Sequence, residues 1–317
     1  MKKVYIGSRT LTLNGHPALK RLEDAGLELI FGPAGEKPSE EEQLRVLPEC
    51  IAYLAGTEKI SKNVLIASKK LQIISRNGVG IENIDLDTAQ SLGIAVMITP
   101  GANAQGVAEL TIALMLSAIR FIPLHNSDLK RGEWNRLKGN ELQNEILGVI
   151  GTGNIGKKVT SMALSLGIKV LGYDLFPDPS FNPSREFKYV GLKEIFQSSD
   201  IISLHIPSQK RPILDKEAFS IMKNGIYIIN TARAELIDEL ELLRALNTKK
   251  VKIYATDVYS QEPPDIDELI SHPRTICTPH IGAYTEESIN QSVEIAVENI
   301  LNVLGLNDED QYNTRRM

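Results

Sequence analysis

Short apolar runs alternate with amphipathic stretches along almost the whole chain. In the first third, five such runs are separated by segments with helical spacing. Apolar strands that alternate with helices are typical of βαβ units, in which a parallel sheet carries helices on both faces. We therefore predict an α/β fold of doubly wound parallel sheets, the first part being flavodoxin-like. Its predicted strands are Val4–Ile6, Leu27–Phe31, Ile51–Ala55, Leu71–Ser75 and Ile94–Ile98.

A break separates this first series from a second one. Thr99–Asn103 contains a proline and a glycine, and the small and apolar residues that follow predict a helix over 104–120, which Pro123 should end or kink. The second series begins near Glu145, includes a helix over 157–166, and is followed by a last helix over 286–304 that should cross back to the first series. Its predicted strands are Ile146–Ile150, Lys169–Tyr173, Ile201–Leu204, Ile226–Ile229, Ile253–Thr256 and Thr275–Cys277.

Length, charge and cysteine content narrow the class of protein. A chain of 317 residues exceeds one ordinary core, so we expect two domains. The net charge of −5 comes without the clustered Lys and Arg of proteins that bind nucleic acid or anionic membranes. Two cysteines, far apart in sequence, are too few for a disulfide framework or a four-ligand zinc site. No signal peptide or membrane-spanning run stands out. We expect a cytoplasmic protein without metal, nucleic acid or membrane.

A glycine-rich turn lies between the first strand and first helix of the second series. Its sequence, Gly151-Thr152-Gly153-Asn154-Ile155-Gly156, has the G-x-G-x-x-G spacing of dinucleotide-binding turns, and Asp174 ends the next predicted strand. The glycines would permit a tight turn, close approach of a pyrophosphate and close packing of helix on strand. Asp174 would accept hydrogen bonds from ribose hydroxyls and repel a 2′-phosphate. The expected cofactor is therefore NAD.

Three polar residues follow later strands of the same series. Arg233, Glu262 and His280 each lie just past a predicted strand, and ligands of doubly wound sheets bind at the carboxyl ends of the strands. Taken singly, each has a plain explanation, as a surface ion-pair or loop residue. Together they suggest one site, in which Arg233 holds a carboxylate, His280 passes a proton, and Glu262 orients the imidazole and stabilises its charged form.

These motifs resemble those of the D-isomer-specific 2-hydroxyacid dehydrogenase family over nearly the whole chain, most of all its phosphoglycerate dehydrogenase branch. The segments that carry the resemblance are 77–85, 151–156 with Asp174, 205–207, 230–233, 257–263 and 280–283. The resemblance implies a Rossmann NAD-binding domain (101–285) inserted into a substrate domain (1–100 and 286–317). It also implies a homodimer built on the NAD-binding domains.

The resemblance also implies roles for individual residues. Arg233, Glu262 and His280 would be catalytic, and the substrate would be a small 2-hydroxy or 2-keto acid. The residues expected to contact NAD are Gly151, Gly153, Asn154, Ile155, Gly156, Asp174, His205, Pro207, Thr231, Ala232, Arg233, Asp257, His280, Gly282 and Ala283. The residues expected to contact substrate are Arg76, Asn77, Gly78, Val79, Gly80, Arg233 and His280.

Several alternatives stay open at this point. Arg76 could bind a substrate phosphate, which would favour 3-phosphoglycerate, or could be a capping or interface residue. Trp134 could contact a second subunit, although local packing is the favoured interpretation. Ala234-Glu235 and the segment 208–212 depart from the common family sequences, and no C-terminal regulatory domain is expected. A dinucleotide-sensing binding protein, of the corepressor type, is the alternative to an enzyme.

Overall fold

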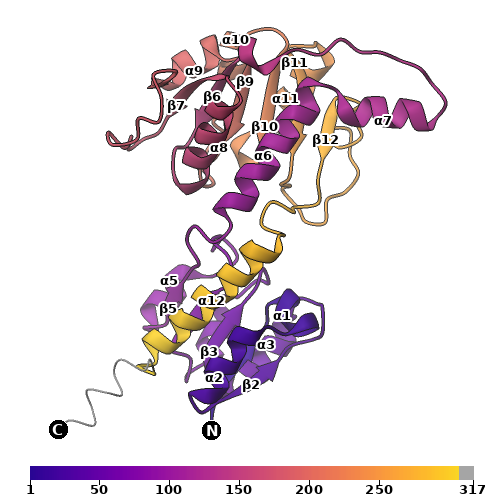
Figure 1. Ribbon diagram of the computed structural model, residues 1–317. Coiled ribbons are helices and arrows are strands. Elements are labelled where there is room, and N and C mark those ends of the chain that lie inside the picture. The colour runs from indigo at the N-terminus through magenta and orange to yellow at the C-terminus, as the bar shows by residue number, and fades with distance from the viewer. Residues whose placement is uncertain (307–317) are drawn as a thin grey trace. The chain divides into compact units, whose positions relative to one another are not determined.

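The computed structural model describes residues 1–306, which form two compact units (Figure 1). We call them the terminal unit, made of Met1–Asn103 and the segment that begins at Glu286, and the inserted unit, Ala104–Thr285. Residues 307–317, which the sequence analysis assigns to the substrate domain, lie outside the described residues. The prediction of one α/β domain inserted into another is confirmed.

The terminal unit has a parallel sheet of five strands in its described residues, in the order β2-β1-β3-β4-β5. The strands are β1 (Lys2–Ile6), β2 (Leu27–Phe31), β3 (Cys50–Ala55), β4 (Ile73–Arg76) and β5 (Ala95–Met97). The helices are α1 (Arg9–Asn14), α2 (Lys20–Asp24), α3 (Glu40–Val46), α4 (Lys62–Ala67), α5 (Leu86–Ser91) and α12 (Glu286–Val303). Helix α12 packs Val293, Val297 and Ile300 against this sheet, and Ser75 Oγ donates to the carbonyl oxygen of Ala296 at 2.8 Å. The predicted return of the last helix to the first series is confirmed.

The inserted unit has a parallel sheet of seven strands in the described residues, in the order β12-β11-β10-β9-β6-β7-β8. The strands are β6 (Ile146–Ile150), β7 (Lys169–Tyr173), β8 (Phe187–Tyr189), β9 (Ile201–Leu204), β10 (Ile226–Asn230), β11 (Val251–Thr256) and β12 (Thr275–Cys277). The helices are α6 (Ala104–Ile119), α7 (Ile122–Lys130), α8 (Asn154–Ser165), α9 (Leu192–Ser198), α10 (Lys216–Ile221) and α11 (Glu239–Asn247). The strand order reverses between β6 and β9, and ligands of such sheets bind beyond the carboxyl ends of the strands at this point.

Two apolar cores sandwich the inserted sheet. One contains buried side chains of α6 and α8, such as Met115 and Val159, and the other contains those of α9, α10 and α11, such as Phe219 and Leu242. Both faces of a parallel sheet must be covered in this way because both are apolar. The strands β6, β9, β10 and β11 are therefore held by packed cores on both faces of the sheet, which fixes the positions of their carboxyl ends.

Some boundaries differ from those expected. Helix α8 begins at Asn154 and not at Lys157, since the glycine turn passes directly into the helix. Strand β8 was not predicted, because three residues at a sheet edge form no apolar run. Phe121 has a left-handed backbone (φ 53°) that separates α6 from α7. The predicted break near Pro123 is confirmed: α6 ends at Ile119, and Pro123 lies in the first turn of α7.

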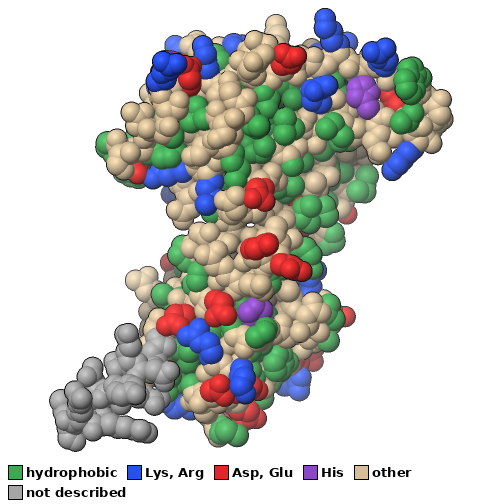
Figure 2. All heavy atoms as spheres, viewed as in Figure 1, with side chains coloured by type: hydrophobic (Ala, Val, Ile, Leu, Met, Phe, Trp, Pro, Cys, Tyr) green, Lys and Arg blue, Asp and Glu red, His purple; other side chains and the backbone are tan. Residues whose placement is uncertain are grey.

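Side chains of both charge signs are scattered over the visible face of each unit (Figure 2). In residues 1–306 no single helix is long and apolar enough to cross a membrane; only α6 and α7 together reach that length, and they are bent by 62°. Helix α6 buries many of its residues within the inserted unit.

Candidate active site

Two glycines of the glycine-rich turn are required by the fold itself. Gly151 has φ 97°, and a Cβ there would lie 2.5 Å from the carbonyl oxygen of His205. A Cβ at Gly156 would lie 1.9 Å from the carbonyl oxygen of Gly151. Side chains are excluded at both positions because backbone atoms occupy the space.

Gly153 needs a different explanation. A Cβ at this position would meet no atom of the described chain within 4 Å, and its φ of −73° suits any residue. Gly153 is also the N-cap of α8 and makes no side-chain capping bond. The open space and the N–H groups of Asn154 and Ile155 in the first turn of α8 fit a pyrophosphate, which gains from the positive end of the helix. The residues present therefore fit a dinucleotide.

Asp174 lies directly after β7, beside the glycine turn. Its Oδ2 accepts hydrogen bonds from the backbone N–H and the hydroxyl of Thr152, at 2.7 and 3.2 Å, and its Oδ1 accepts from the N–H of Phe176 at 3.0 Å. These bonds fix the carboxylate without using all its lone pairs. The half-exposed side chain can still accept from ribose hydroxyls.

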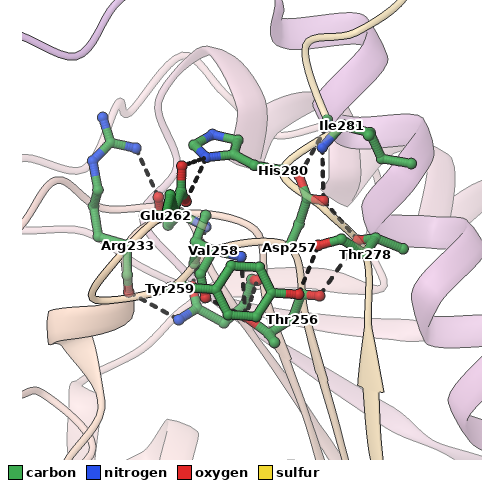
Figure 3. A network of polar contacts seen from close by, with 12 residues as sticks. Arg233, Thr256, Asp257, Val258, Tyr259, Glu262, Thr278, His280 and Ile281 are labelled. Carbon is green, nitrogen blue, oxygen red and sulfur yellow. Dashed lines mark hydrogen bonds and ion pairs between the residues drawn. The ribbon is translucent and has the colours of Figure 1, made fainter. Parts of the chain in front are cut away.

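His280 and Glu262 form the central contact of the site. His280 Nδ1 lies 2.7 Å from Oε1 and 2.8 Å from Oε2 of Glu262 (Figure 3). The imidazole side chain is 48% exposed, so solvent or substrate can reach it. With Nδ1 turned to the carboxylate, Nε2 is the ring nitrogen that can exchange a proton. The pairing that the sequence analysis expects is present.

Asp257 holds the backbone on both sides of His280. This buried carboxylate follows β11, and its Oδ1 accepts from Thr278 Oγ1 at 2.6 Å and from the N–H of Ile281 at 2.8 Å. Its Oδ2 accepts from the N–H of Gly282, also at 2.8 Å. Between these anchors His280 has φ 52°, a left-handed conformation that is costly for a residue with a side chain. Asp257 is expected from the sequence to contact the cofactor; its hold on the backbone around His280 has no signal in the sequence and is seen only in these hydrogen bonds.

Arg233 lies at the end of β10, and its guanidinium points toward Glu262 (Figure 3). Asn230 shapes this turn, since its Oδ1 accepts from the N–H of Ala232 and its Nδ2 donates to the carbonyl oxygen of Arg233 at 2.8 Å. Thr231 is buried, and its hydroxyl shares a 2.8 Å hydrogen bond with Thr111 of α6. Arg233, Glu262 and His280 are therefore brought together, as expected, by the ends of neighbouring strands.

His205 lies at the end of β9, where the strand order reverses. Its Nε2 lies 2.8 Å from the hydroxyl of Ser203, and burial lowers the pKa of the imidazole to about 3. A neutral ring is therefore expected at physiological pH. Its carbonyl oxygen lies against Gly151, as described above, so the backbone of His205 borders the glycine turn. Pro207 is exposed two residues later.

The remaining expected residues belong to the loop after β4 in the terminal unit. Asn77 donates from its backbone to the carbonyl oxygen of Ala55 at 2.9 Å and from Nδ2 to Ser8 Oγ at 3.1 Å. The carbonyl oxygen of Gly78 accepts from the N–H of Thr99. Arg76 donates from Nε to the carbonyl oxygen of Gly80 at 3.0 Å. Arg76, for which binding of a substrate phosphate and a capping or interface role are both open, thus donates to its own loop.

The exposure of Trp134 contradicts the local packing that is favoured for it from the sequence. Its side chain is 80% exposed, so it does not pack locally as the sequence analysis favours.

The comparisons with known proteins agree with this geometry. Residues 112–282 match the family described as D-isomer specific 2-hydroxyacid dehydrogenase, NAD binding domain. The chain is 38% identical to a hydroxypyruvate reductase of Thermotoga maritima, over 86% of this chain and 90% of that protein. It is also 38% identical to a D-3-phosphoglycerate dehydrogenase of Methanocaldococcus jannaschii, over 90% of this chain and 55% of that protein. The chain thus spans about half the length of that dehydrogenase.

Solved structures are similar over almost the whole chain. The D-lactate dehydrogenase from Aquifex aeolicus, complexed with NAD and lactic acid, has a TM-score of 0.83 at 27% identity and covers 98% of this chain and 97% of its own. A glyoxylate reductase structure has a TM-score of 0.85 at 28% identity, over 95% of each chain. The predicted fold class and NAD-binding domain are confirmed. The chain belongs to the D-isomer specific 2-hydroxyacid dehydrogenase family.

Proposed function

We propose that this chain is an NAD-dependent D-2-hydroxyacid dehydrogenase that acts as a reductase of small 2-keto acids, with His280 as its acid and base. The observation that carries the proposal is the contact of His280 Nδ1 with both carboxylate oxygens of Glu262, at 2.7 and 2.8 Å. A carboxylate at Nδ1 stabilises the protonated imidazole and orients Nε2. A stabilised protonated form and a fixed Nε2 are what a general acid and base requires.

Each polar residue then has a distinct task. Bound NAD would supply or accept the hydride at the substrate C2 atom. In reduction, His280 would give its Nε2 proton to the C2 oxygen, and in oxidation it would take that proton back. Arg233 would bind the substrate carboxylate through two N–H donors and polarise the C2 oxygen. Glu262 would balance the charge that His280 carries.

The test is NADH oxidation against glyoxylate, hydroxypyruvate and aliphatic 2-keto acids. Removing the acid in His280→Ala should lower kcat by about 10²- to 10⁴-fold, while the Kd for NADH stays close to that of the wild type. Glu262→Gln should lower kcat less, because the imidazole remains. His272→Ala, which removes another histidine of the inserted unit, should be close to wild type.

Two results would contradict the proposal. Near-normal turnover by His280→Ala would remove His280 from the mechanism. Tight NADH binding by the wild type, without turnover of any 2-keto acid or of 3-phosphoglycerate with NAD, would favour the dinucleotide-sensing protein.

We also propose that the chain forms a homodimer through its inserted unit. Helix α7 extends away from the sheet of its own unit and buries none of its residues (Figure 1). This helix and the segment after it, which we call the arm (residues 122–141), expose several large apolar side chains. They are Ile122, Leu129, Trp134 and Leu137, at 52, 60, 80 and 46% exposure. Exposed aromatic and aliphatic side chains of this kind are typical of subunit contacts.

A further inference from the structure

The guanidinium of Arg76 is enclosed by the loop that follows it. Its Nε donates to the carbonyl oxygen of Gly80 at 3.0 Å, and its Nη1 donates to the carbonyl oxygen of Asn77. The backbone of Gly78 passes so close that a Cβ there would lie 2.1 Å from Nη1. Gly78 also has φ 141°, which favours glycine. The loop 77–80 is therefore shaped around this side chain.

The hydrogen bonds from Arg76 to the carbonyl oxygens of Asn77 and Gly80 also determine the direction of the backbone N–H groups of the loop. The peptide group is planar and trans, so a carbonyl that points at the guanidinium sends the following N–H the opposite way. The carbonyl of Gly80 thus directs the N–H of Ile81 away from Arg76. Within residues 1–306, no protein group accepts a hydrogen bond from the N–H of Val79 or Gly80. The loop keeps N–H donors that a carboxylate can use.

The positive charge of Arg76 also acts on a buried residue of the terminal unit, Glu58. Burial raises the pKa of Glu58, and the bond from Tyr53, the backbone bonds and the charge of Arg76 act against that rise. Glu58 Oε1 accepts from Tyr53 Oη at 2.5 Å and from the N–H of Gly56 at 2.8 Å. Arg76 therefore donates to two loop carbonyls, and its charge also acts on the buried Glu58.

We propose that Arg76 is a positioning residue for the loop 77–80 and not a ligand for a substrate phosphate. The proposal rests on the function proposed above, with the substrate carboxylate bound by N–H groups of this loop as well as by Arg233. If the guanidinium turned to a phosphate, the carbonyl oxygens of Asn77 and Gly80 would lose their donor, and the loop would lose the shape that carboxylate binding needs. The substrate class that fits is a small, unphosphorylated 2-keto acid.

The test compares Arg76→Lys and Arg76→Ala with the wild type, using hydroxypyruvate and its 3-phospho derivative. In both variants KM should rise roughly tenfold to hundredfold for both acids alike, with a smaller change in kcat and an unchanged Kd for NADH. Lysine should not rescue KM, since one ammonium group cannot replace two directed donors. Amide hydrogen exchange at Asn77 and Thr99, whose N–H groups donate to the carbonyl oxygens of Ala55 and Gly78, should become faster in both variants.

A double-mutant cycle with Gly78→Ala adds a second test. A methyl group at Gly78 should displace the guanidinium, so the effects of Gly78→Ala and Arg76→Ala on KM should not add. Gly93→Ala is the matched control, because Gly93 also has a positive φ (70°) but no atom within 4 Å of its Cβ position. Its effect should add to that of Arg76→Ala.

Three results would overturn the role of Arg76: a KM increase confined to the phosphorylated acid, recovery by lysine, or additive effects with Gly78→Ala. Absence of any turnover by the wild type would instead count against the proposed function. In that case, hydrogen exchange still decides whether Arg76 shapes the loop, because this readout needs no activity.

Discussion

At the scale of single residues, Asp257 has the clearest consequence for the site. Its carboxylate accepts three hydrogen bonds, from Thr278, Ile281 and Gly282, and so holds His280 at φ 52°. In Asp257→Asn the amide nitrogen cannot accept from an N–H group, so at least one of these donors loses its partner. We expect unfolding free energy to fall by about 1–3 kcal/mol and kcat to fall at least tenfold.

The control for this prediction is Asp265→Asn, which removes an equal charge from an exposed position in the same unit. Thermal unfolding and NADH oxidation, measured side by side, check the prediction. Equal behaviour of the two variants would show that Asp257 does not hold His280 in place.

At the scale of elements, different glycines of the turn between β6 and α8 are expected to serve the stability of the fold and the binding of the cofactor. Gly156→Ala places a methyl group 1.9 Å from the carbonyl oxygen of Gly151, so it should destabilise the inserted unit by about 1–3 kcal/mol or more. Gly153→Ala meets no atom within 4 Å and should leave Tm unchanged, yet raise the Kd for NADH at least tenfold, because the methyl group occupies the space left for the pyrophosphate.

Gly191→Ala is the matched control for Gly153→Ala. Gly191 is also a helix N-cap with a negative φ (−71°) and an open Cβ position, but it begins α9, away from the glycine turn. Thermal unfolding and NADH titration of the three variants check the prediction. An unchanged Kd in Gly153→Ala would mean that the phosphates bind elsewhere.

At the scale of the whole molecule, the arm (residues 122–141) is the proposed contact between the subunits of the homodimer. Replacing Trp134 and Leu137 together by alanine should shift the protein from dimer to monomer in sedimentation velocity, since two exposed apolar side chains at the contact are lost. Leu240→Ala, which truncates an exposed leucine of α11, should leave the dimer intact. A wild type that sediments as a monomer at micromolar concentration, or a dimer that survives the double substitution, would refute the proposed contact.

Much of this architecture could be predicted because its signals are local. The alternation of apolar runs and helical stretches specifies parallel α/β units, and Gly156 is required by a backbone contact within its own turn. Arg233, Glu262 and His280 could be grouped because parallel strands end at one edge of a sheet. Local signals failed where the outcome depended on a neighbour distant in sequence, as for the short edge strand β8 and the exposed Trp134.

By itself, the sequence determined the fold class, the glycine turn, Asp174 and the three polar residues at strand ends. Only the tertiary structure showed that Asp257 accepts hydrogen bonds from both sides of His280 and that Arg76 donates to its own loop. The physical reason is that a side chain's role depends on which way it points and which groups it meets. Those groups, such as Gly282 for Asp257, come from different segments, and folding alone decides their distances.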